Sequence, residues 1–260
     1  MLTTFCLRLA CGMIGSLALL SSKEVNPRFF RTHYLVALGL VCLAAIAMPF
    51  GDTSPMIAIW FGLRVVILPI AAIICCLGSF SWWIEGNPGS RIIGISCDIL
   101  LIMALGFQTG LSVERLASAD FAVMLAGELT SAALLGTAVT AMLLGHSYLI
   151  APGMSLAPLM RLLTALFVAT GLRMILAAWG LWSWTAGHSL VNWEDETVLW
   201  LPVRWGLGFG GPLILGWMAR SAAKIRSTQS ATGILYVVVI FTFLGELTSQ
   251  FLLANTGYLL

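Results

Sequence analysis

The chain has 260 residues, of which 60% are hydrophobic and only 9% are charged. Soluble domains carry about 25% charged residues, so this composition excludes an ordinary soluble protein and indicates a chain that crosses a lipid bilayer repeatedly. The net charge of +2 comes without a basic tract, so no nucleic-acid partner is indicated. We expect a multi-pass protein of the cell inner (cytoplasmic) membrane.

Eight segments are apolar over about the 20 residues that a helix needs to span a bilayer. In chain order they cover 4–21, 33–50, 56–80, 92–110, 120–147, 159–184, 197–218 and 232–256. The first has Arg8 near its centre and no clean A-x-A cleavage site, so we expect it to be retained. The sequence predicts an all-α integral membrane protein, a bundle of eight transmembrane helices in a single polytopic domain over 1–260.

The charges between these segments alternate along the chain. One set of connections carries the basic residues Lys23, Arg28, Arg31, Arg91, Arg161, Arg220, Lys224 and Arg226. The other set carries Asp52, then Glu114, Arg115 and Asp120, then Glu194, Asp195 and Glu196. Because basic loops stay on the cytoplasmic side, the alternation places both termini outside.

Two glutamates lie inside apolar segments in the same local sequence. The pentapeptide GELTS occurs at Gly127–Ser131 and again at Gly245–Ser249. A carboxylate at membrane depth costs a few kcal/mol on insertion scales, so it usually faces protein or a water-filled cavity. Glu128 and Glu246 are therefore the first candidate functional residues. The two copies are explained equally well by a duplication and by convergence.

Three arginines share the depth of these glutamates. Counting about 1.5 Å per helical residue places Arg64, Arg173 and Arg204 in the outer half of the bilayer together with Glu128 and Glu246. A structural interpretation is that arginine–glutamate pairs lock the bundle together. A functional interpretation is a polar pocket that holds a ligand headgroup, with the arginines as its binding residues and the glutamates as proton relays. The sequence leaves both open.

Cofactor motifs are absent from the sequence. The six cysteines all lie in apolar stretches and form no CxxC pair, so we expect no zinc or iron–sulfur site and interpret them as small buried hydrophobes. Haem b in a membrane bundle needs two facing histidines, whereas His33 and His146 lie at segment ends and His188 lies in a loop. We therefore expect neither haem nor metal in this chain.

Three features of the sequence together resemble a known family. They are Gly245-Glu246-Leu247 in the last segment, Gly210-Gly211-Pro212-Leu213 in the seventh, and the predicted eight-helix topology. The chain is similar to the anchor subunits of dimethyl sulfoxide reductases, which are related to the quinol subunits of the polysulfide-reductase type. The family often has an arginine where this chain has Gln250. The resemblance implies a haem-free membrane subunit that exchanges electrons between a quinone, such as menaquinone, and an iron–sulfur or other redox partner subunit.

Two other functions stay open. The chain could be an accessory subunit that stabilises a larger membrane complex without a site of its own. It could also be a small proton-coupled secondary transporter that uses the two GELTS copies as repeats. No connection is long enough to fold as a soluble domain, so we expect a subunit of a quinol-linked oxidoreductase rather than an enzyme on its own.

Overall fold

The computed structural model describes the chain apart from residues 48–54, 85–88, 116–120, 152 and 188–195, and also without the side chains of 55–61, 89, 111–115, 187 and 196. Helices and short turns make up the described part, with no strand in it. Seven of these helices are long and apolar enough to cross a membrane. Asp52, Asp120, Glu194, Asp195 and His188 lie outside the described residues.

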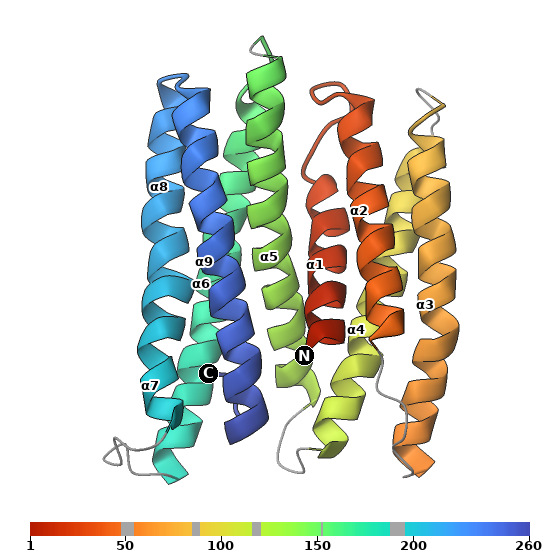
Figure 1. The fold of residues 1–260 in the computed structure, drawn as a ribbon, viewed down its shortest axis with the longest axis vertical. Helices are drawn as coiled ribbons and strands as arrows, with labels where there is room; N and C mark the ends of the chain where they lie inside the picture. Colours follow the sequence, from red (N-terminus) through yellow and green to blue (C-terminus); the bar gives the residue numbers. More distant parts are fainter. Residues whose placement is uncertain (48–54, 85–88, 116–120, 152, 188–195) are drawn as a thin grey trace. The chain divides into compact units, whose positions relative to one another are not determined.

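The helices group into two compact units that divide within α5 (Phe121–Ile150), between Gly136 and Thr137. The N-terminal unit holds α1 (Leu2–Leu17), α2 (Pro27–Ile46), α3 (Pro55–Ser81), α4 (Gly89–Arg115) and the first half of α5 (Figure 1). The C-terminal unit holds the rest of α5, α6 (Ala157–Gly187), α7 (Glu196–Pro202), the π-helix η1 (Val203–Gly210), α8 (Gly211–Lys224) and α9 (Thr228–Thr256). The expectation of a single polytopic membrane domain over 1–260 stays a prediction.

Seven of the eight expected spans coincide with helices that are long and apolar enough to cross a membrane, with differences at their ends. The expected span 197–218 is covered by three consecutive elements, α7, η1 and α8. α1 is apolar but only 16 residues long, shorter than the other seven. α2 begins at Pro27 rather than at residue 33, because Asn26 caps it: the Asn26 Oδ1 accepts a hydrogen bond of 2.9 Å from the Arg28 amide. Proline also suits the first position of a helix. The polar residues before position 33 are therefore helical, although they lie outside the expected apolar span.

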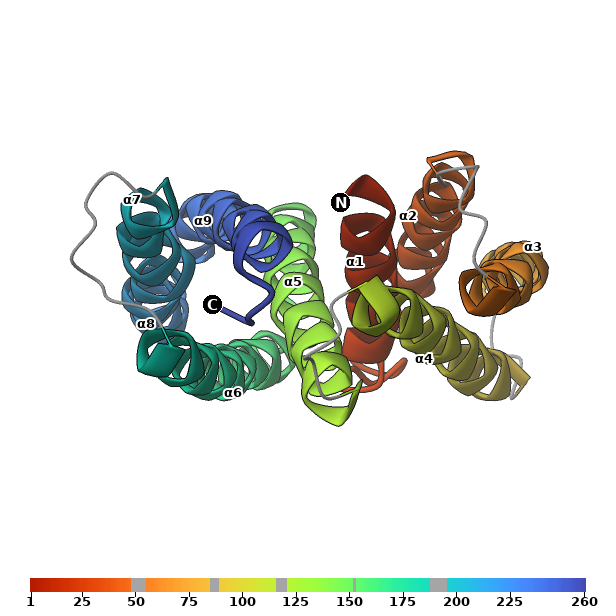
Figure 2. The same ribbon diagram turned by 90° about the horizontal axis from the view of Figure 1, so that it is seen from below.

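The N-terminal unit is built on close helix contacts. α1 packs against α2 and α4, α2 against α3, and α3 against α4 (Figure 2). α1 also crosses the first half of α5 at Gly12, where a Cβ would overlap the backbone of Ala132 and approach that of Gly136. Small residues allow membrane helices to approach this closely, and dispersion forces and hydrogen bonds then replace the hydrophobic effect that acts in water.

The C-terminal unit holds its own last residues inside it. α8 packs against α6 and α9, and η1 packs against α9. Gly257 ends α9 in the left-handed conformation, with φ 78°, and its amide bonds the Leu253 carbonyl at 2.9 Å. Glycine adopts this conformation without strain, and the chain then turns back between α6, α8 and α9 (Figure 2). Leu260 packs there with Trp184 and Leu252.

The apolar span Thr197–Lys224 is irregular at its glycines. Between Val203 and Gly210 the helix widens to the π form, and the Gly211 amide bonds the Gly206 carbonyl five residues back. Pro212 has no amide hydrogen, so it cannot continue the ordinary bonding to the residue four positions back. The structure therefore forms a π-helix here, an element that often occurs at functional sites.

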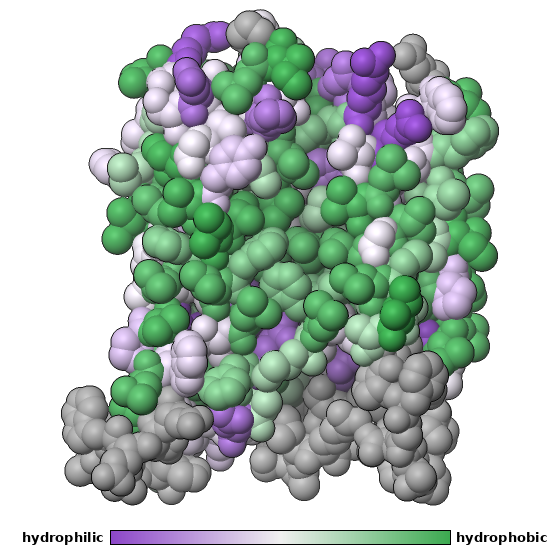
Figure 3. Space-filling view, viewed as in Figure 1, coloured by the Kyte–Doolittle hydropathy of each residue, from purple (hydrophilic) through white to green (hydrophobic). Residues whose placement is uncertain are grey.

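Large apolar side chains cover the outside of the helices. In Figure 3 hydrophobic residues form the middle of the face shown, and hydrophilic ones gather at one end. Ile73, Trp179 and Ile214 are each at least 60% exposed. Apolar surface on this scale marks a face that contacts another apolar phase, here the acyl chains of a bilayer.

Candidate functional site

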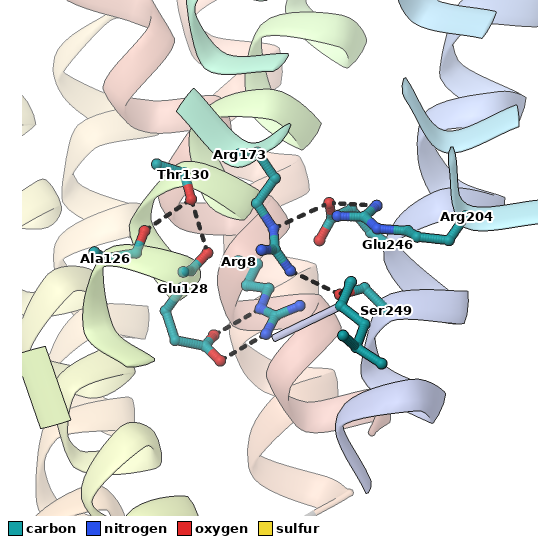
Figure 4. A network of polar contacts seen from close by, with 10 residues as sticks. Arg8, Ala126, Glu128, Thr130, Arg173, Arg204, Glu246 and Ser249 are labelled. Atoms are coloured by element: carbon teal, nitrogen blue, oxygen red, sulfur yellow. Dashed lines mark hydrogen bonds and ion pairs between the residues drawn. The ribbon is translucent and has the colours of Figure 1, made fainter. Parts of the chain in front are cut away.

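Glu246 lies at the centre of a buried polar cluster in the C-terminal unit. Its Oε1 is 3.1 Å from Nη1 of Arg204 on η1 and 3.6 Å from Nε of Arg173 on α6 (Figure 4). All three side chains are completely buried. Two guanidinium groups therefore converge on one carboxylate oxygen, from helices separated by long stretches of sequence.

A contact between two glycines positions Arg204 against α9. A Cβ on Gly208 of η1 would lie 2.8 Å from the Cα of Gly245, and a Cβ on Gly245 would be closer still to Gly208. The two backbones thus touch directly beside Glu246. The Arg204 guanidinium also lies over the Phe209 ring, 4.1 Å from its centroid, which adds a cation–π interaction.

Ser249 extends the cluster one helical turn beyond Glu246. The Arg173 Nη2 donates to Ser249 Oγ at 2.7 Å, and Ser249 Oγ donates to the Leu260 oxygen at 3.0 Å. Because Glu246 and Ser249 are three residues apart, they share one face of α9. A hydrogen-bonded path therefore runs from Arg173 through Ser249 to the returning tail.

Gln250 lies one turn after Glu246 and is also buried, with 6% of its surface exposed. Neither its amide nitrogen nor its amide oxygen has a hydrogen-bond partner among the described residues. Leaving a buried polar group without a partner costs about 1–3 kcal/mol, so such a group usually forms a hydrogen bond to water or to a ligand. This amide can both donate and accept a hydrogen bond beside the Glu246 cluster.

The other GELTS glutamate has a different environment in the N-terminal unit. Glu128 on α5 forms a two-pronged pair with Arg8 on α1: Arg8 Nε donates to Oε2 and Arg8 Nη2 to Oε1, each at 2.6 Å (Figure 4). Both residues are almost fully buried. A bidentate arginine–carboxylate pair of this kind satisfies both oxygens and fixes the geometry of the two helices.

The two copies of the pentapeptide are locally alike. In each, the glycine, the glutamate and the serine are buried. The threonine hydroxyls donate to the carbonyl four residues back, Thr130 to Ala126 and Thr248 to Leu244, both at 2.8 Å. The motif thus buries its glycine, glutamate and serine together on one side of a helix, whereas the arginines that meet each carboxylate come from elsewhere.

Arg64, the third candidate arginine, is buried in the N-terminal unit between α3 and α4. Its Nη1 donates to the side-chain oxygen of Gln108 on α4. The structure therefore brings Arg173 and Arg204 to Glu246, places Arg8 against Glu128, and places Arg64 against Gln108. Sequence reasoning missed Arg8 and Gln108 as partners, although each is a polar residue inside an apolar segment, and so met the same criterion as the glutamates.

No group of three histidine, cysteine, aspartate or glutamate side chains in the described part of the chain is arranged to hold a metal ion. His33 is buried on α2, where its Nδ1 donates to the Phe29 carbonyl at 2.9 Å. This bond within the helix orients the ring without involving a second histidine.

Comparisons of the chain with models of protein families, with curated proteins and with solved structures find no match.

Proposed function

We propose that this chain is a haem-free, quinone-interacting membrane anchor subunit of a multi-subunit respiratory oxidoreductase in the inner membrane. The C-terminal unit contains the site, formed by Arg173, Arg204, Glu246, Ser249 and Gln250. Menaquinone or a related quinone is the bound substrate. The electrons pass to or from an iron–sulfur or other redox subunit, because this chain carries no cofactor motif of its own.

The buried amide of Gln250 is the observation that carries the proposal. Neither of its polar atoms has a hydrogen-bond partner among the described residues, so both can bind a ligand one turn from Glu246. A quinone carbonyl accepts hydrogen bonds, so the Gln250 Nε2 can donate to it, and a quinol hydroxyl can donate to the Gln250 Oε1. The apolar helices around the cluster suit the rest of such a ligand, since cofactor sites are mostly apolar with a few polar groups that fix orientation.

Glu246 provides the proton chemistry that quinol oxidation needs. Oxidation of a quinol releases two electrons and two protons, and a carboxylate within hydrogen-bond reach of the headgroup accepts a proton as a general base. The two arginines stabilise the buried carboxylate by their charge. Ser249 links Arg173 to the tail and so offers a hydroxyl through which a proton can leave the site.

The proposed orientation places all eight expected segments across the bilayer, with both termini outside. These segments include α1, and they count α7, η1 and α8 together as one. The described basic residues support this orientation: in the C-terminal unit Arg161, Arg220, Lys224 and Arg226 cluster at the turns joining α5 to α6 and α8 to α9. These turns are then cytoplasmic. Glu246 lies past the middle of α9, which starts at that end, so in this orientation the site lies in the outer half of the membrane.

Glu246→Gln in the assembled complex tests this function. The change keeps the shape and hydrogen-bonding capacity of the side chain and removes its ability to take up a proton. We expect quinol-linked turnover to fall at least tenfold while assembly and electron transfer from artificial donors stay close to normal. Loss of assembly would favour the accessory-subunit alternative, and unchanged quinol turnover would contradict the proton role of Glu246.

The transporter alternative gains less support from the geometry. A repeat-based transporter builds its site from corresponding helices of its two halves. Here Glu128 is bound on both oxygens by one arginine, whereas Glu246 is approached by two arginines on one oxygen. The bidentate pair of Glu128 suits a structural role, whereas the cluster around Glu246 suits a ligand-binding site.

A further inference from the structure

Two cysteines face each other across α3 and α4 of the N-terminal unit. The Sγ atoms of Cys75 and Cys97 are 3.3 Å apart, and both side chains are completely buried. Atoms in ordinary non-bonded contact lie about 3.5–4.0 Å apart. A disulfide bond of about 2.05 Å requires the two sulfurs to move together by only about 1.3 Å.

The register of the two helices holds these sulfurs opposite each other. Near the connection between α3 and α4, Ser81 Oγ donates to Ser90 Oγ at 2.8 Å. At the far end Arg64 bonds Gln108. Arg64 lies eleven residues before Cys75 on α3, and Gln108 lies eleven residues after Cys97 on α4. Each separation is about three helical turns. The cysteine pair therefore lies between two fixed points of one antiparallel interface.

We propose that Cys75 and Cys97 form a redox-active pair that closes into a disulfide between α3 and α4. The two thiols give up two protons and two electrons, and one S–S bond forms. The electrons go to a lipid-soluble oxidant, because both sulfurs lie inside membrane-spanning helices. The bond prevents α3 from sliding along α4 and so fixes the contact of Arg64 with Gln108 three turns away.

The neighbouring cysteine provides a control. Cys76 follows Cys75 directly but is exposed on the outer surface of α3, and Cys42 is exposed on α2. Neither faces another described thiol in the way that Cys75 does. Replacing both by serine removes the thiols most able to react between molecules and leaves four of the six cysteines.

The test uses the full chain with Cys42→Ser and Cys76→Ser in lipid nanodiscs, treated with copper(II)–phenanthroline. Two copper(II) ions accept one electron each, and the protons pass to solvent. The protein is then denatured and alkylated with a maleimide, and the adducts are counted by mass spectrometry. We expect two adducts after oxidation and four after subsequent reduction, with Cys75 and Cys97 in one linked peptide.

Addition of Cys97→Ser should leave three adducts with and without the oxidant. Four adducts after oxidation of the chain with Cys42→Ser and Cys76→Ser would overturn the proposal, as would a linked peptide that contains Cys6 or Cys11 in place of either partner. The linked peptide is identified in a chain that keeps both cysteines, so the test stands even if Cys97→Ser fails to fold.

Discussion

Gly208 and Gly245 pack backbone against backbone, so that a Cβ on Gly208 would lie 2.8 Å from the Cα of Gly245. Real side chains do not tolerate such a separation without movement of the backbone. The contact joins η1 to α9 at the residue before Glu246, and the Arg204 Nη1 lies 3.3 Å from where either Cβ would be. Gly245, the glycine of the second GELTS copy, therefore lets η1 approach α9 closely enough for Arg204 to pair with Glu246.

Replacement of Gly245 by alanine should separate η1 from α9 and weaken the Arg204–Glu246 contact. Overpacking of a tight interface costs about 1–3 kcal/mol, so the midpoint of thermal unfolding in detergent should fall by several degrees. Gly233→Ala on the same helix is the matched control, because no atom lies within 4 Å of its Cβ position. Equal stability of the two variants would contradict the role of the glycine contact.

Loss of either partner of the Arg8–Glu128 pair should destabilise the N-terminal unit strongly. Glu128→Gln leaves a buried guanidinium without its counter-charge, at a cost of about 3–5 kcal/mol. The charge-free combination of Arg8→Met with Glu128→Leu should recover most of this loss, since it removes both buried charges. Unfolding titrations in mixed micelles measure the difference. A double variant no more stable than Glu128→Gln would show that the pair is not the source of the effect.

The sequence was informative about helices because a membrane span is recognised by length and hydropathy alone. It was less informative at helix ends, which depend on single groups such as the Asn26 cap before Pro27. The widening of η1 also depends on hydrogen bonding around Pro212 that hydropathy does not report. Likewise, α1 was expected over 4–21 and ends at Leu17, where the turns before α2 begin.

A shared level along the helices was predictable for Arg173, Arg204 and Glu246, whereas rotation about the helix axes was not. Counting residues gives the height of a charge in the bilayer, and Arg173, Arg204 and Glu246 do meet. Helices that are apolar on every side give no signal of which face points inward, because lipid and protein interior are equally apolar. For this reason Arg8 was not foreseen as the partner of Glu128, nor Gln108 as that of Arg64.

Both chain termini should be accessible from outside the cell. The basic residues around the α1–α2 and α8–α9 connections favour the cytoplasm. If α1 and α9 each cross the membrane once, the terminus at the far end of each helix lies outside. A short protease-sensitive tag at either end should be cleaved in intact spheroplasts by protease added outside. A tag protected at one end only would mean that α1, with its 16 residues, does not cross the membrane.

Quinone binding to the purified chain tests the central claim most directly. In nanodiscs a short-tailed menaquinone analogue should quench the fluorescence of the chain's tryptophans in a saturable way. Gln250→Leu removes one buried hydrogen bond to the headgroup, worth about 1.4 kcal/mol, and should weaken binding about tenfold. Gln229→Leu, on the exposed start of the same helix, should bind like the unaltered chain. Absence of saturable binding, or equal affinity of the Gln250→Leu and unaltered chains, would contradict a quinone site at Glu246 and Gln250.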